Sequence, residues 1–242
     1  MWILLKVLQT SYHLSKAISL FVLMMAQLGD TPSFSPVSVI GSQFIAPYQF
    51  DIIVDRSSRG SHVITDNNHK ILFKVKSCNT SFHLQRVLLD VDDKPIVTIR
   101  QKIMTEHYRW NVFKGDSKRE SDIIFTTKTP HMIQFKTGVQ VFLANKASNK
   151  KACDFKIEGS WSKKNCTINM GDTSATIAQM YKMQSSENIK FASDKFKVTI
   201  YPGVDYAFVV TLIAIVEAMK KDEVAAAVSG GVVGGVIGAA FA

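Results

Sequence analysis

The sequence predicts a mainly β fold, a closed antiparallel barrel of about a dozen strands that encloses its own C-terminal helix. Two observations lead to this prediction. Short β-type runs separated by turn residues follow one another from about Tyr48 to Tyr201, at a spacing of roughly 8–12 residues, which is typical of sandwiches and closed barrels. They are followed by an unbroken apolar block, Tyr206–Val216, and no long helical periodicity precedes it in this part of the chain.

The strands are expected where β-branched and aromatic residues gather between turn residues. Eleven such runs can be named in chain order: Phe50–Asp55, His62–Thr65, Ile71–Lys76, Arg86–Asp90, Pro95–Arg100, Tyr108–Phe113, Asp122–Thr126, Val139–Leu143, Cys153–Ile157, Ala175–Met180 and Phe196–Tyr201. The polar segment Val91–Lys94 joins two of these runs into a hairpin.

The C-terminal helix is expected to be buried on all sides. The Tyr206–Val216 block is apolar around the whole helical wheel, so the helix is surrounded either by protein or by lipid. Its 11 residues fall short of the roughly 20 that span a bilayer. We therefore expect the barrel to surround it, with Phe208, Leu212 and Ile215 lining the interior.

Several sequence blocks together resemble the plant LURP-one-related family. Eight of them occur in order: Gly41–Tyr48, Ile71–Lys76, Gln85–Asp90, Lys94–Met104, Arg109–Gly115, Val141–Asn145, Asp154–Trp161 and Val198–Phe208. The match extends from about Gly41 to Glu223. The resemblance implies a tubby-like fold, a barrel of roughly twelve strands around a hydrophobic helix. It also implies distant kinship with tubby C-terminal domains and phospholipid scramblases, and a setting in plant defence.

Length and composition fit one domain. The chain has 242 residues, of which 46% are apolar, and all-β barrels of this size commonly form single units. We place the LURP-one-related barrel domain at residues 41–223, after an N-terminal extension at residues 1–40. The extension has either a weak signal-like segment without a clear cleavage site or a non-native start, with initiation at Met24 or Met25. Recovery of a native peptide covering residues 7–16 would exclude the non-native start.

Residues 224–242 form a Gly/Ala-rich apolar tail. Its 19 uncharged residues are long enough for a thin membrane, and Gly230, Gly234 and Gly238 have the spacing of close-packed transmembrane helices. The tail and the Tyr206 block could also form a hairpin anchor. The alternative is a flexible tail, because glycine disfavours a helix by about 1 kcal/mol per residue relative to alanine.

The charge balance points to anionic partners. The chain has 29 Lys and Arg against 20 Asp and Glu, a net charge of +9. Such an excess favours an anionic phospholipid or phosphoinositide surface. Arg100 and Lys102 are expected on one face of a strand, where their charges converge. Further basic clusters are Lys114/Lys118/Arg119, Lys146/Lys150/Lys151 and Lys163/Lys164. Motifs typical of nucleic-acid-binding proteins are absent from the sequence, which argues against that class of partner.

No motif predicts catalysis, a cofactor or a metal. The segment starting at Asp90 imitates a calcium loop, but Pro95 stands where glycine is needed and Gln101 where glutamate is needed. Ser160-x-x-Lys163 lacks the partner motifs of serine acyl enzymes. Three scattered cysteines suit a reducing compartment, so we expect a cytoplasmic protein, peripheral to or tethered at a membrane, rather than a secreted one.

The function expected from the sequence is a non-enzymatic binding module for lipid or an unidentified protein partner. A closed barrel has no free strand edge, which favours a monomer. Two other classes stay open: a scramblase-like lipid-handling membrane protein, and a membrane-released transcriptional regulator suggested by the tubby analogy alone.

Overall fold

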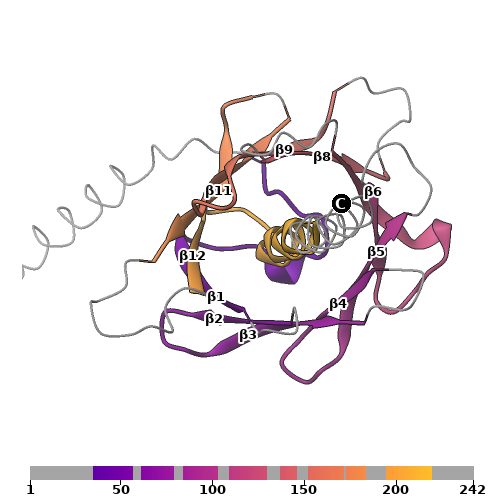
Figure 1. Cartoon of the computed structure of the whole chain (residues 1–242), viewed down its shortest axis with the longest axis horizontal. Helices are drawn as coiled ribbons and strands as arrows, with labels where there is room; N and C mark the ends of the chain where they lie inside the picture. Colours follow the sequence, from indigo (N-terminus) through magenta and orange to yellow (C-terminus); the bar gives the residue numbers. More distant parts are fainter. Residues whose placement is uncertain are drawn as a thin grey trace, which may run out of the picture. The chain divides into compact units, whose positions relative to one another are not determined.

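The computed structural model describes residues 35–56, 61–78, 84–102, 109–129, 137–145, 152–171, 173–183 and 195–219. Twelve strands form a closed antiparallel barrel around a helix, as Figure 1 shows in a view along the barrel. The strands are β1 (Phe50–Arg56), β2 (His62–Asp66), β3 (Ile71–Ser77), β4 (Gln85–Leu89), β5 (Pro95–Lys102), β6 (Arg109–Lys114), β7 (Ile123–Lys128), β8 (Thr137–Leu143), β9 (Phe155–Ser160), β10 (Asn165–Met170), β11 (Thr176–Lys182) and β12 (Lys195–Ile200). Short 3₁₀ turns lie at Ser42–Phe44 and Glu120–Asp122.

The barrel closes between the first and last strands. Each strand pairs with its neighbours in the sequence, and β1 pairs with β12 as well as with β2. Phe50 lies opposite Ile200, and Asp55 lies opposite Lys195. Closure leaves no strand edge unpaired, so the backbone donors and acceptors of both terminal strands are satisfied. The predicted fold class is thereby confirmed.

Alternation along the strands separates the interior from the outside. In β1, Ile52 and Val54 are fully buried, whereas Ile53 between them and Asp55 after them are partly exposed. Successive side chains of a strand point to opposite faces, so a strand needs only every second residue to be apolar. This explains why the predicted runs contain so many Lys, Asp and Arg residues.

One strand, β10, is missing from the eleven runs named from the sequence. It covers Asn165–Met170 and pairs with β9 and β11. Its alternation is real, because Cys166 and Ile168 are buried while Thr167 between them is not. The strand carries only a few apolar residues among small polar ones, and its outward face reads as turn sequence. Other differences are at strand ends: Asp122 belongs to a 3₁₀ turn before β7, and Cys153 and Asp154 precede β9.

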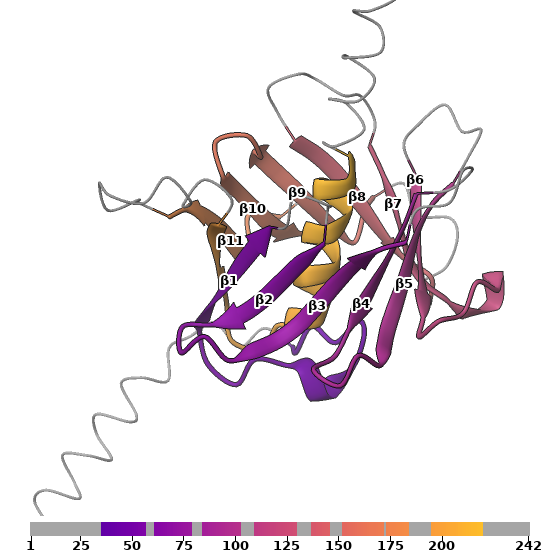
Figure 2. The same cartoon turned by 60° about the horizontal axis from the view of Figure 1, so that its bottom comes forward.

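The helix, residues 206–219 of the described chain, lies inside the barrel and runs along it, as Figure 2 shows from the side. Every residue from 207 to 219 is buried. Phe208 contacts Phe125 of β7 with ring centroids 5.2 Å apart, and Phe155 of β9 at 4.9 Å. Leu212 and Ile215 have no exposed surface. Because every residue from 207 to 219 is buried, the helix needs no polar face.

The start of the helix is held by one carboxylate. Asp205 has no exposed surface, and its Oδ1 accepts a hydrogen bond from the amide of Phe208, which is an N-cap interaction. Its Oδ2 accepts bonds from three successive amides, those of Val39, Ile40 and Gly41, at 2.7–3.1 Å. Asp205 therefore joins the segment before β1 to the helix.

Candidate functional site

Lysine and arginine gather at one end of the barrel. In an antiparallel barrel, alternate strands start and finish at the same end, so residues distant in sequence meet there. The end where the described part of the helix finishes carries a set of cations that we call the basic rim: Arg56, Lys102, Arg109, Lys128, Lys164, Lys182 and Lys195. Two of its pairings make the geometry clear: Arg56 lies opposite His62, and Lys102 lies opposite Arg109.

Three of these cations lie side by side on the outward face. Lys102 of β5 is directly opposite Arg109 of β6, which is directly opposite Lys128 of β7. We call these three residues the basic row. Neighbouring strands are about 4.8 Å apart, so the row places three charges within roughly 10 Å. Within the described part of the chain, none of the three side chains has a hydrogen bond or an ion pair. Like charges placed directly opposite one another are destabilising.

Arg100 extends the basic row. It lies two residues before Lys102 on the outward face of β5, as the alternation in the sequence predicts. Its cross-strand neighbours are Gln85 and Asn111, neither of which carries a charge. The Nε atom of Arg100 is buried without a hydrogen-bond partner. The charge of Arg100 is therefore not balanced by a described neighbour.

The opposite end of the barrel differs in its charge pairing. Cations there face carboxylates: Lys74 and Lys76 lie 3.2 and 3.3 Å from Asp93, and Arg119 lies 2.8 Å from Asp122. Of the clusters named from the sequence, Lys114/Lys118/Arg119 lies at this end and Lys163/Lys164 at the basic rim. Lys146/Lys150/Lys151 lies outside the described residues. Several cations of the opposite end are thus paired with carboxylates, whereas the three cations of the basic row lie opposite one another.

A buried carboxylate lies inside the basic rim. Glu217, near the end of the described helix, is 6% exposed. Its Oε1 accepts hydrogen bonds from the indole Nε1 of Trp161 at 2.7 Å and from Nζ of Lys164 at 2.9 Å. Its Oε2 lies 2.8 Å from Nε of Arg56 and 3.7 Å from Nε2 of His62. We call these five residues the Glu217 cluster.

The surrounding charges keep Glu217 ionised. Burial by itself would raise the pKa of this carboxyl, but His62, Lys164 and Arg56 outweigh it and lower the pKa to about 2. Burial lowers the pKa of Lys164, and the negative charge of Glu217 opposes that effect. A buried charge is stable only when it is paired and hydrogen-bonded, and Glu217 meets both conditions.

The turn between β9 and β10 positions Lys164 for this contact. Lys164 has a φ of +52°, a left-handed conformation that is uncommon for a residue with a side chain. Its ammonium lies 4.9 Å from the Trp161 ring centroid and 4.3 Å from that of Phe196. Both aromatic faces attract the cation, so the side chain is fixed over them and reaches Glu217.

Sequence reasoning missed the Glu217 cluster. Glu217 reads as the first charge after an apolar block, where a solvent-exposed helix end is the ordinary interpretation. A signal was nevertheless present in the sequence, because two apolar residues, Ala218 and Met219, follow Glu217 before the lysines begin. The partners come from β1, β2 and the β9–β10 turn, and no spacing in the sequence relates these segments to one another.

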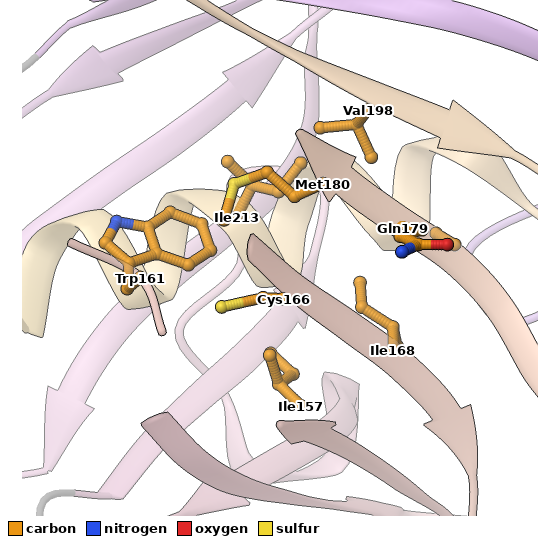
Figure 3. A pocket seen from close by; sticks show the side chains of 9 residues that line it. Ile157, Trp161, Cys166, Ile168, Gln179, Met180, Val198 and Ile213 are labelled. Atoms are coloured by element: carbon orange, nitrogen blue, oxygen red, sulfur yellow. The ribbon is translucent and has the colours of Figure 1, made fainter. Parts of the chain in front are cut away.

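The interior offers little room for a ligand beside the helix. A cavity of about 10 Å³ lies between β9–β12 and the helix, where Trp161, Met180 and Ile213 gather (Figure 3). A water molecule needs about this much space and also two or more polar partners. The lining is mainly apolar, so this cavity is a packing gap.

No helix among the described ranges is long and apolar enough to cross a bilayer.

Comparison with known proteins gives one consistent family. The family described as LURP-one-related matches residues 53–217. The chain is 37% identical over 207 residues to Protein LURP-one-related 15 of Arabidopsis thaliana, covering 82% of this chain and 95% of that protein. It is 38% identical over 190 residues to Protein LURP1 of the same organism, covering 77% and 91%. An X-ray structure of an Arabidopsis thaliana protein is similar with a TM-score of 0.60 at 35% identity, covering 76% of this chain and 98% of that one.

Proposed function

The chain belongs to the LURP-one-related family, and on that premise we propose that it is a non-enzymatic intracellular module that binds anionic phospholipid surfaces. Binding takes place through Arg100 and the basic row. The ligand class is a membrane rich in acidic phospholipid or phosphoinositide headgroups.

The observation that carries the proposal is the unbalanced charge of the basic row. Lys102, Arg109 and Lys128 repel one another and find no carboxylate among the described residues. At the opposite end of the barrel, Lys74, Lys76 and Arg119 are paired with carboxylates. An external anion would relieve the repulsion, and each Lys or Arg near an acidic membrane contributes about 1 kcal/mol. Four cations can therefore strengthen binding by roughly 10²–10³-fold.

The direction of the helix supports a membrane-facing orientation. Glu217 contacts Arg56 and Lys164, so the described helix finishes at the basic rim. Residues 224–242, outside the described residues, follow in the sequence and carry no charge. A surface bound at the basic rim would be the one closest to the point where the helix finishes. Tethering through those residues is the second part of the proposal.

Vesicle co-sedimentation tests the first part. The variant replaces four residues by Gln: Arg100, Lys102, Arg109 and Lys128. A control with the same change in net charge replaces four exposed residues of the opposite end: Lys70, Lys94, Lys114 and Lys118. We expect the first variant to lose binding to phosphatidylserine or phosphoinositide vesicles at low salt, and the control to keep most of it. Equal losses in both variants would mean that net charge alone drives binding, which contradicts a site at the basic row.

Salt dependence separates peripheral binding from the scramblase-like alternative. Screening shortens electrostatic interactions to about 3 Å at 1 M ionic strength, so binding through the basic row should disappear there. Insertion of apolar segments would persist at high salt. Binding that survives 1 M salt in the full chain would favour the lipid-handling class.

The setting in plant defence rests on the family resemblance. Plants lacking the protein, complemented with the wild-type chain or the four-residue variant, would be compared for pathogen growth. Equal growth in mutant and wild-type plants would remove defence from the proposal.

A further inference from the structure

The Glu217 cluster is also a binding site, and we propose that it takes phosphate groups. In this structure the carboxylate of Glu217 occupies the site as an internal ligand. The proposal is independent of the basic row, because none of Lys102, Arg109 and Lys128 contacts the cluster.

Donors of three chemical kinds converge on one carboxylate. Arg56, Trp161 and Lys164 each place a nitrogen 2.7–2.9 Å from an oxygen of Glu217. They come from the end of β1 and the β9–β10 turn, whereas the carboxylate comes from the helix. A guanidinium, an ammonium and an indole N–H are the donors that phosphate oxygens accept. The donors belong to the barrel wall, so they stay in place when Glu217 is removed.

His62 faces Glu217 only at long range. It is 4% exposed, and both ring nitrogens lack a hydrogen-bond partner. Its Nε2 faces the carboxylate from 3.7 Å, which is too far for a hydrogen bond. A buried polar group without a partner is rare in native proteins. Glu217 Oε1 already accepts two of the donors and Oε2 accepts one, whereas a phosphate group offers three or four oxygens and so has more acceptors for the same set of donors.

The charge and the exposure of the cluster favour replacement of the Glu217 carboxylate by a phosphate dianion. Arg56 and Lys164 carry two positive charges against the single charge of Glu217. The side chain of Arg56 is 38% exposed, so the site has access to solvent at that point. Arg56 meets Glu217 through Nε, and its two terminal nitrogens carry further N–H donors. Cys166 is a further titratable group that acts on Lys164.

Phosphate binding to Glu217→Gln is the direct test. Titration calorimetry with inorganic phosphate, at ionic strength held constant with sodium chloride, would compare this variant with the wild-type chain. Removal of the competing carboxylate should make phosphate bind at least about tenfold more tightly. Adding Arg56→Gln should abolish the gain. Adding Lys195→Gln, which neutralises another cation of the basic rim, should leave it intact. Equal phosphate affinity in wild-type and Glu217→Gln chains would overturn the proposal.

A measurement on the wild-type chain covers the case in which Glu217→Gln does not fold. Displacement of Glu217 by phosphate would loosen the helix end, so amide exchange at residues 216–219 should accelerate in phosphate relative to chloride. The acceleration should be absent in Arg56→Gln. Identical exchange in both salts would contradict displacement.

Vesicles of phosphatidylcholine with and without phosphatidic acid distinguish a headgroup from free phosphate, and Arg56-dependent binding to either source supports the site. Binding to neither would overturn it.

Discussion

At the scale of single residues, Glu217 shows how one buried charge can be made stable by its surroundings. Two cations, an indole N–H and a histidine surround a carboxylate that is 6% exposed. Removal of one partner from such a group generally destabilises a protein by about 3–5 kcal/mol, because the remaining charge loses its compensation. The interaction should therefore be visible as a dependence of stability on pH.

We predict that Glu217 makes the folding stability of the protein fall in acid. The pKa of Glu217 is lowered from 4.5 to about 2 in the folded protein. A lowered folded-state pKa stabilises the protein above the unfolded value and loses this contribution as the pH falls toward 2. The shift corresponds to about 3 kcal/mol in the free energy of unfolding. Denaturant unfolding of wild type and Glu217→Gln between pH 7 and pH 2 would measure it.

The comparison with Glu217→Gln isolates this residue from other carboxyls. Asp51 also has a lowered pKa, because Thr199 and Lys197 outweigh the effect of its partial burial. Such groups contribute equally to both chains and cancel in the difference. We expect the stability gap between the chains to be constant above about pH 5 and to shrink below it. A gap that does not change down to pH 2 would rule out an ionised Glu217 as its source.

At the scale of elements, the helix and most of the strands could be predicted, because each is specified by its own sequence. An apolar block with no polar face defines a buried helix, and alternation defines strands such as β1. The strand β10 could not be predicted in this way, because the polar residues Thr167 and Asn169 hide the alternation of Cys166 and Ile168. The burial of the helix on all sides requires the strands to surround it, which they do because the barrel is closed.

The same reasoning could find only part of the candidate site. Arg100 and Lys102 share a strand, so alternation puts them on one face. Arg109 and Lys128 join them only through the pairing of β5, β6 and β7, which is a property of register. The Glu217 cluster depends on barrel closure, which brings the first strand, β1, beside the last strand, β12. Contacts between distant segments of this kind leave no local pattern.

The central helix gives a prediction at this scale. Leu212→Asp would place an unpaired charge where the wild-type side chain has no exposed surface. Burying an unpaired charge outweighs the stability of about 5–15 kcal/mol that a typical domain has, so the chain should not fold. Circular dichroism and thermal melting would show it. Val91→Asp, at a side chain that is 51% exposed, serves as the control and should melt close to wild type. A normal melting transition in Leu212→Asp would be incompatible with a helix enclosed by the barrel.

At the scale of the whole molecule, the two ends of the barrel differ in how their cations are paired. At one end several cations are paired with nearby carboxylates, whereas the basic row of the other end has no ion pair among the described residues. An uneven field of this kind orients a protein as it approaches an anionic surface, because the end with excess positive charge is attracted first. The membrane would then meet the end of the barrel at which the described helix finishes.

Truncation after Glu223 tests whether the charges or the apolar tail dominate this encounter. Charge attraction requires only the basic rim, so the truncated chain should bind acidic vesicles at low salt as well as the full chain does. Both chains should also lose binding together as the ionic strength rises, because the Debye length falls from about 10 Å at 0.1 M to about 3 Å at 1 M. Co-sedimentation of both chains across this range measures the two contributions. A salt-resistant bound fraction found only with the full chain would assign the attachment to residues 224–242, since apolar insertion does not weaken when charges are screened.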